Sequence, residues 1–149
     1  MKTVLLMQTA LALAGTMVLA RTAAAVDLQP YRWNNRLILI FAPVQTDSNY
    51  LIVKERLSEL RDEIDDRDIV LFHLFEDGES RVQDSPLKSG GADSLRRKYQ
   101  IKPGALTLVL IGKDGGEKMR QRNRANFNAI FSRIDAMPMR RQEMKQRRR

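Results

Sequence analysis

The sequence predicts an α/β protein in which a mixed β-sheet carries helices on both faces, in the order βαβαββα. Three continuous apolar runs predict strands that are buried on both sides. An amphipathic segment of helical length separates the first two runs, as in a strand–helix–strand unit. An Asp-Gly turn after the third run predicts a final hairpin.

The first half of the chain supplies two strands and the helix between them. The run Leu37–Phe41 is apolar throughout and predicts the first strand. Apolar residues then recur at three- and four-residue spacing from Tyr50 to Ile64, which predicts one helix of about four turns, capped by Asp47 or Ser48. The run Ile69–Phe75 predicts the second strand, which a right-handed crossover makes parallel to the first.

The middle of the chain is more polar. Glu76–Gly91 contains glycine, proline and many charged residues, so we expect a long loop without strands. Ala92–Tyr99 predicts a short helix that turns Leu95 and Tyr99 inward and its basic residues, Arg96 among them, toward solvent.

The second half ends in a hairpin and a helix. Leu106–Ile111 predicts a third buried strand, and Glu117–Arg122 predicts a polar edge strand that returns after the Asp-Gly turn. A closing helix begins near Asn123 or Asn126 and ends at Met137-Pro138. Two parallel strands followed by an antiparallel hairpin form the thioredoxin core arrangement. The residues expected at its centre are Leu39, Phe72 and Val109.

Charge and composition divide the chain into three parts. Residues 1–25 combine a basic start, an uncharged stretch and two small-residue cleavage patterns, Val18-Leu19-Ala20 and Ala23-Ala24-Ala25, which is the layout of a cleaved signal peptide. A retained membrane anchor is the alternative, but a bilayer span needs ~20 apolar residues. Residues 26–139 form the predicted domain, with net charge +1, and residues 140–149 form a basic tail with net charge +5. We therefore expect an exported protein, periplasmic or secreted, without an integral membrane span after cleavage.

Three segments resemble a bacterial family of unknown function. They are LQPYRWNNRLILIFAP from Leu28, GKDGGEKMR from Gly112 and FSRIDAMPMRRQEM from Phe131, and the resemblance covers about Leu28 to Met144. It implies an exported, thioredoxin-like, peroxiredoxin-related domain, similar to one in animal extracellular sushi-repeat-containing proteins. The resemblance implies no particular reaction.

Redox chemistry is excluded by composition, because the chain contains no cysteine. Thioredoxin-like enzymes carry their cysteines after the first core strand, where this chain reads APVQTDSN from Ala42. The usual cis-proline site before the third strand holds Ala105, with Pro103 further upstream. Disulfide exchange and peroxide reduction in this fold both need a thiolate, so we expect neither activity and no cofactor.

The loop after the first strand is the candidate ligand site. Its polar residues are Thr46, Asp47, Ser48 and Asn49. Free amides at a helix N-terminus suit a small anion, but the favoured interpretation is that Asp47 or Ser48 only caps the helix. A cysteine-independent enzyme would add Asp77 or Arg81 from the long loop, and it would require Thr46, Asp77 and Arg81 to meet in one pocket.

Three further groups have structural explanations that we favour. His73 lacks a nucleophile motif and is expected to be a hydrogen-bonded histidine within the sheet. The acidic cluster Asp62–Asp68 lacks the glycine and final glutamate of a calcium loop, so we expect no metal. Tyr31 and Trp33 are expected to pack on the sheet edge with Arg32 in solvent, although such a string can also form a binding surface.

The tail is the strongest indication of a partner. Its basic residues are Arg140, Arg141, Lys145, Arg147, Arg148 and Arg149. Each cation gains ~1 kcal/mol near an anionic lipid surface, although a tail that only aids solubility is an equal alternative. Nucleic acid is not expected as the partner of an exported protein. We expect the tail to be solvated, so that deleting residues 140–149 leaves the melting temperature unchanged.

These observations favour an exported, non-redox module that binds a protein or an anionic envelope surface. The alternative is a cysteine-independent enzyme, or a protein that protects indirectly against oxidants, using the loop after the first strand.

Overall fold

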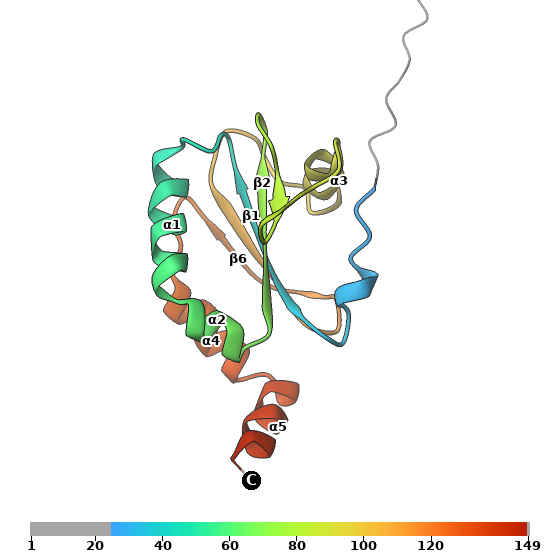
Figure 1. Ribbon diagram of the computed structural model, residues 1–149, viewed down its shortest axis with the longest axis vertical. Coiled ribbons are helices and arrows are strands. Elements are labelled where there is room, and N and C mark those ends of the chain that lie inside the picture. Colours follow the sequence, from blue (N-terminus) through green and yellow to red (C-terminus); the bar gives the residue numbers. More distant parts are fainter. Residues whose placement is uncertain (1–24, 149) are drawn as a thin grey trace, which may run out of the picture.

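A six-stranded mixed sheet forms the centre of the computed structural model, which describes residues 25–148 (Figure 1). The strands are β1 (Arg36–Ala42), β2 (Ile69–Phe75), β3 (Arg81–Val82), β4 (Ser85–Pro86), β5 (Thr107–Ile111) and β6 (Glu117–Arg122). The helices are the 3-10 helix η1 (Gln29–Tyr31) and the α-helices α1 (Ser48–Glu59), α2 (Arg61–Asp66), α3 (Gly91–Lys98), α4 (Phe127–Asp135) and α5 (Pro138–Arg147). Apart from Ala25, the predicted signal peptide lies outside the described residues.

The sheet has the strand order β4-β3-β2-β1-β5-β6. β1 pairs in parallel with β2 and β5 pairs antiparallel with β6, both as predicted, and β1 also pairs antiparallel with β5. Leu39 on β1 lies opposite Phe72 on β2 and Val109 on β5, and all three side chains have no exposed area. The predicted α/β class and the predicted centre of the sheet are therefore confirmed.

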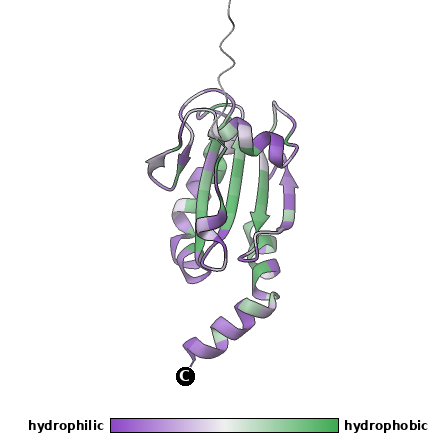
Figure 2. Ribbon diagram, turned by 90° about the vertical axis from the view of Figure 1, so that its right-hand side faces the viewer, coloured by the Kyte–Doolittle hydropathy of each residue, from purple (hydrophilic) through white to green (hydrophobic). Residues whose placement is uncertain are grey.

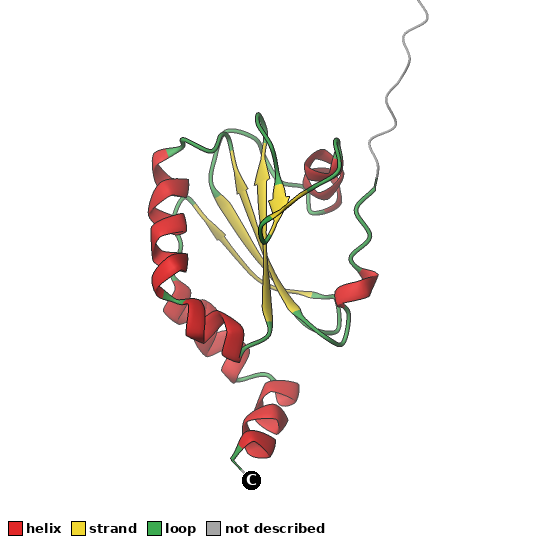
Figure 3. Cartoon of the chain, in the orientation of Figure 1, coloured by secondary structure: helices red, strands yellow, loops and turns green. Residues whose placement is uncertain are grey.

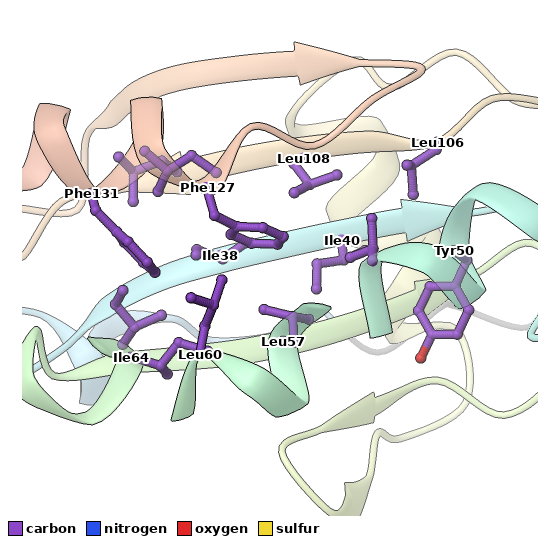
Figure 4. Packing of buried hydrophobic residues seen from close by; sticks show 14 of the residues in the cluster. Ile38, Ile40, Tyr50, Leu57, Leu60, Ile64, Leu106, Leu108, Phe127 and Phe131 are labelled. Atoms are coloured by element: carbon purple, nitrogen blue, oxygen red, sulfur yellow. The ribbon is translucent and has the colours of Figure 1, made fainter. Parts of the chain in front are cut away.

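Alternate residues of β1 face two separate apolar layers, as the pleat of a strand requires. Ile38 and Ile40 pack against α1, α2 and α4 on one side of the sheet, where Figure 4 shows them beside Leu57 and Phe127. Leu39 belongs to the layer on the other side, which includes residues of α3 (Figure 3). In Figure 2 the central strands are hydrophobic, whereas α5 is mostly hydrophilic.

The structure corrects two predicted boundaries. The helix predicted up to Ile64 is divided at Leu60 into α1 and α2, because the backbone of Leu60 leaves the helical conformation at φ −101° and ψ 22°. The apolar stripe continues across this break, so hydrophobic spacing does not detect it. The predicted loop Glu76–Gly91 contains the short hairpin β3–β4, whose two-residue strands are too short to show a period of two.

The last described residues form a helix. Pro138 begins α5, and its fixed φ suits the first helical turn. Figure 1 shows α5 projecting beyond the lower end of the sheet. Among residues 25–148, no helix has both the length and the apolar character needed to cross a bilayer.

Candidate functional site

The loop between β1 and α1 presents a capped helix N-terminus. The carboxylate of Asp47 accepts a hydrogen bond from the Tyr50 backbone N–H at 2.9 Å, which confirms the capping interpretation. The other predicted residues of this loop, Thr46, Ser48 and Asn49, are exposed. The loop is tied to the end of β2, because the Pro43 carbonyl accepts from the Asp77 backbone N–H at 3.1 Å.

The three residues that an enzyme site would need do not converge on one groove. Asp77 is exposed near the first βα loop, whereas Arg81 lies on β3 opposite His73. Arg81 lines an open groove of about 610 Å³ between α1 and the β2–β3 hairpin, and neither Thr46 nor Asp77 lines it. We refer to it as the His73 groove; its lining includes Tyr50, Lys54, Leu71, His73, Arg81 and Asp84.

His73 is a hydrogen-bonded histidine within the sheet, as predicted. Its Nδ1 lies 3.0 Å from the hydroxyl oxygen of Tyr50, which comes from the first turn of α1. The Tyr50 ring packs edge-on against Phe75, with 4.8 Å between ring centroids. This contact fixes the position of the hydroxyl group relative to β2.

Burial and neighbouring charge keep His73 neutral. Burial, followed by the positive charges of Arg81 and Lys54, lowers the pKa of His73 to about 4, against a smaller opposing effect of Asp84. Burial also raises the pKa of Tyr50, so its hydroxyl stays protonated and can donate to the histidine ring. The groove therefore contains a neutral imidazole in a positive local field.

Arg96 ties together the ends of β1 and β2. Its Nη2 donates to the Ala42 carbonyl at 3.0 Å and to the Leu74 carbonyl at 3.1 Å, and its guanidinium lies over the Phe41 ring. The prediction that Arg96 faces solvent is therefore wrong. The Ala42 carbonyl also accepts a hydrogen bond from the Glu76 backbone N–H at 3.1 Å, so the buried guanidinium adds a side-chain donor to the backbone hydrogen bonds at the ends of the two strands.

The two aromatic residues before β1, Tyr31 and Trp33, differ in their packing. Tyr31 packs edge-on against Phe72, with 5.5 Å between centroids, as expected. Trp33 does not pack on the sheet: it is 57% exposed, its φ is 68°, and the Arg32 guanidinium lies 5.0 Å from its ring centroid. The backbone N–H of Trp33 donates to the carbonyl of Lys113, which lies in the turn between β5 and β6. This hydrogen bond fixes the left-handed backbone conformation of Trp33. The prediction for Trp33 is wrong because a backbone contact, rather than the apolar ring, decides its conformation.

One side of α5 is held against the body by ion pairs, and we refer to its residues Arg140, Glu143 and Arg147 as the docked stripe. Glu143 accepts a hydrogen bond from each of the two Nη groups of Arg36, both at 3.2 Å. It also forms an ion pair with Lys113 Nζ at 2.9 Å. Arg36 is only 1% exposed, so a buried guanidinium at the start of β1 depends on a carboxylate 107 residues later in the chain. Burial opposes ionisation of Glu143, but the bonds from Arg36 and Lys113 hold its pKa below the usual range.

Arg140 completes this docked stripe. It donates to the Asp66 carbonyl and carboxylate and to Asp135 Oδ1, the last at 3.2 Å. Arg147, two turns further on, also pairs with Asp66. The expectation that the whole tail is solvated is wrong for Arg140, which is 2% exposed, because Asp66 and Asp135 lie at the ends of α2 and α4 and compensate its charge.

The opposite stripe of α5 carries cations without partners. Arg141 and Lys145 are four residues apart, and Arg148, the cap residue directly after the helix, follows after three, so the three fall on one side. All three are exposed, and none forms an ion pair with residues 25–148. Arg149 lies outside the described residues. The predicted partner-binding set thus separates into docked cations, Arg140 and Arg147, and outward cations.

Sequence reasoning missed part of the His73 groove. It did not connect His73 with Tyr50 and Lys54, although these two lie four residues apart and therefore on one side of α1. A helix that covers the β2 strand predicts such a contact. Within residues 25–148 no cluster of three or more potential ligand side chains could hold a metal ion.

Comparisons with known proteins identify a family and a fold, and they do not establish a reaction. Residues 27–143 match the sequence profile of the family described as "Domain of unknown function (DUF4174)". Among solved structures, the chain is similar to the reduced 2-Cys peroxiredoxin of Plasmodium vivax, with a TM-score of 0.58 and 17% identity over 78% of this chain and 85% of that one. At this identity the likeness establishes a thioredoxin-like fold alone.

Proposed function

The chain belongs to the DUF4174 family, and we propose that it is an exported, non-redox thioredoxin-like module that binds an anionic envelope surface through α5. The observation that carries this proposal is the division of the α5 charges into two stripes. One stripe is used to fix the helix on the body, and the other leaves Arg141, Lys145 and Arg148 directed away from it.

The docked stripe supports the proposal because it gives the outward stripe a fixed position. Arg140 and Glu143 are held by partners from β1, α2, α4 and the β5–β6 turn, so the helix does not depend on its own few turns for stability. The three outward cations are exposed and spaced for one side of the helix. Figure 1 shows that this helix projects from the body.

The strength of such binding follows from the number of outward cations. Three charges near an anionic lipid surface contribute about 3 kcal/mol, or about a hundredfold in apparent affinity. Such attraction is long-range and is screened over ~8 Å at physiological ionic strength. Attachment should therefore be reversible and sensitive to salt.

Two other features support a non-redox module outside the cytoplasm. The full sequence contains no cysteine, so the thiolate chemistry of thioredoxin-like enzymes has no nucleophile here. Residues 1–25 have the composition of a cleaved signal peptide, and the proposal includes their removal on export. Mass spectrometry of the native protein should find a mature chain that begins near Val26.

The proposal is tested with vesicles that contain anionic phosphatidylserine or only neutral phosphatidylcholine. The triple variant Arg141→Gln, Lys145→Gln, Arg148→Gln should lose most binding to anionic vesicles at low salt. The matched control is Arg97→Gln, Lys102→Gln, Arg122→Gln, which removes three exposed cations elsewhere and should bind as the unmodified protein does. Equal binding by both triple variants would contradict a role for α5.

A further inference from the structure

The His73 groove is a second polar surface, formed by elements other than α5. It lies between α1 and the β2–β3 hairpin, and its volume of about 610 Å³ is in the range of small-molecule sites. We propose that the His73 groove binds the oxyanion group, a carboxylate or a phosphate, of a small-molecule ligand, which Arg81 and Lys54 hold beside His73.

Arg81 is the main reason for this assignment. Its Nε is buried without a hydrogen-bond partner, and its guanidinium pairs with no carboxylate among residues 25–148. The Nε atoms of Arg36 and Arg96 also lack partners, but the Nη groups of those residues are hydrogen-bonded to the protein. Arg81 alone of the three keeps its planar guanidinium available, and this group pairs with carboxylate and phosphate through two parallel hydrogen bonds.

Lys54 adds a second positive charge from α1. Its side chain is exposed and forms no ion pair with the described residues. The acidic residues that line the groove are Glu55, Asp65 and Asp84, and Arg61 adds a further cation. Near His73 itself the effects of Arg81 and Lys54 exceed that of Asp84, so an anion is favoured at this end of the groove.

His73 supplies a hydrogen-bond donor. When the Tyr50 hydroxyl donates to Nδ1, the neutral ring carries its hydrogen on Nε2. No described residue accepts a hydrogen bond from Nε2, so this group is available to a ligand. The edge-on packing of Tyr50 and the pairing of His73 with Arg81 across two strands fix the three groups relative to one another.

His73 also makes the proposal directly measurable, because it is the only histidine in the sequence. Its imidazole signals are followed by NMR while inorganic phosphate or succinate is added, with sodium chloride at matched ionic strength as the reference. We expect saturable shifts with at least one of the two anions, and a rise in the pKa of His73, since a nearby anion favours the protonated ring. A response to phosphate alone identifies a phosphate site, and a response to succinate alone identifies a carboxylate site.

Variants separate a specific site from general screening. Arg81→Gln should weaken binding by about tenfold or more, as expected for the loss of charge-assisted hydrogen bonds. Arg141→Gln removes the same charge on α5 and should leave binding unchanged. If Arg81→Gln does not fold, Lys54→Gln on the exposed side of α1 should still weaken binding several-fold. Shifts equal to those caused by sodium chloride, or unaltered in both groove variants, would overturn the proposal.

Discussion

Leu39 and Val109 pack at the centre of the sheet with no exposed area, whereas α5 buries only one side chain, the charged Arg140. The apolar centre of the sheet is thus stabilised by removal of apolar surface from water, which depends little on pH or salt. The helix is held by ion pairs, which depend on both. Two parts of one small protein therefore respond differently to the same change of conditions.

The largest expected effect tests the apolar region. Leu39→Ala should lower the free energy of unfolding by about 2–5 kcal/mol, because the side chain is fully buried between β2 and β5 and leaves a cavity. Urea titration measures this loss. Leu51→Ala removes the same side chain from a 47% exposed position and should change stability by less than about 0.5 kcal/mol. A loss below about 1 kcal/mol for Leu39→Ala would mean that β1 is not central.

The stability of the fold is expected to depend on pH through His73, which lies on β2 beside α1 and outside the apolar centre. Burial and the charges of Arg81 and Lys54 lower its pKa from 6.5 to about 4, so the unfolded chain binds the proton more readily. The stability that the neutral ring contributes is complete above about pH 6.5 and is lost as pH falls toward 4, up to about 3 kcal/mol. Urea titrations between pH 4 and 7.5 measure this slope. His73→Gln should flatten it, and an unchanged slope would assign the pH dependence to other groups.

The next effect concerns the docking of α5. Glu143→Gln should destabilise the protein by about 1–3 kcal/mol, because the buried guanidinium of Arg36 loses its carboxylate. Thermal unfolding of the variant measures this effect, with Gln142→Ala on the exposed side of α5 as control. The sequence alone predicted that deleting residues 140–149 leaves the melting temperature unchanged. The structure predicts a lower melting temperature for that deletion, since both Arg140 and Glu143 are lost.

The carboxylates that hold α5 should be protonated at a lower pH than that at which His73 begins to destabilise the fold. Bonds from Arg36 and Lys113 outweigh burial and lower the pKa of Glu143, and bonds from Arg67 and Arg140 do the same for Asp135. Their stabilisation is present above the unfolded-state pKa near 4 and is lost as pH falls through the lower folded values. In the His73→Gln variant this acid transition should remain, which separates the two regions by pH.

The smallest effect concerns the exposed end of the same network. Arg147 pairs with Asp66, but its side chain is 48% exposed. Arg147→Gln should therefore lower the free energy of unfolding by less than about 1 kcal/mol. The cost should fall further at high salt, where exposed pairs are screened. Arg56→Gln removes a comparable exposed pair with Glu59 and should behave similarly in thermal unfolding. A larger, salt-independent loss for Arg147→Gln would mean that the end of α5 is part of the buried network.

Much of the fold could be predicted from the sequence because the strands are buried on both faces. Continuous apolar runs such as Leu37–Phe41 have few alternative interpretations, and the Asp-Gly turn fixes the hairpin after β5. The division at Leu60 could not be predicted, since it changes the backbone without interrupting the apolar stripe. The short β3–β4 pair depends on β2 for its hydrogen bonds and has no local signal.

The candidate sites were less predictable because they depend on long-range partners. Arg140 and Arg141 are adjacent and identical in type, but only Arg140 reaches Asp66 and Asp135. Charge patterning assigned both to a solvated tail, since composition does not show which side of a helix meets the body. Arg81 was expected in a long loop, from which it could join the residues of the first βα loop, but the β3–β4 hairpin that carries it places it opposite His73.

The pairing of Arg36 with Glu143 also has a consequence for biosynthesis. Synthesis proceeds from the N-terminus, so β1 is available long before Glu143 has been added. Until then the guanidinium of Arg36 has no carboxylate at its final position, and burying it is unfavourable. A nascent chain, or one that terminates before residue 143, therefore retains an uncompensated charge at the start of its first strand. Completion of the native state is thereby linked to completion of translation.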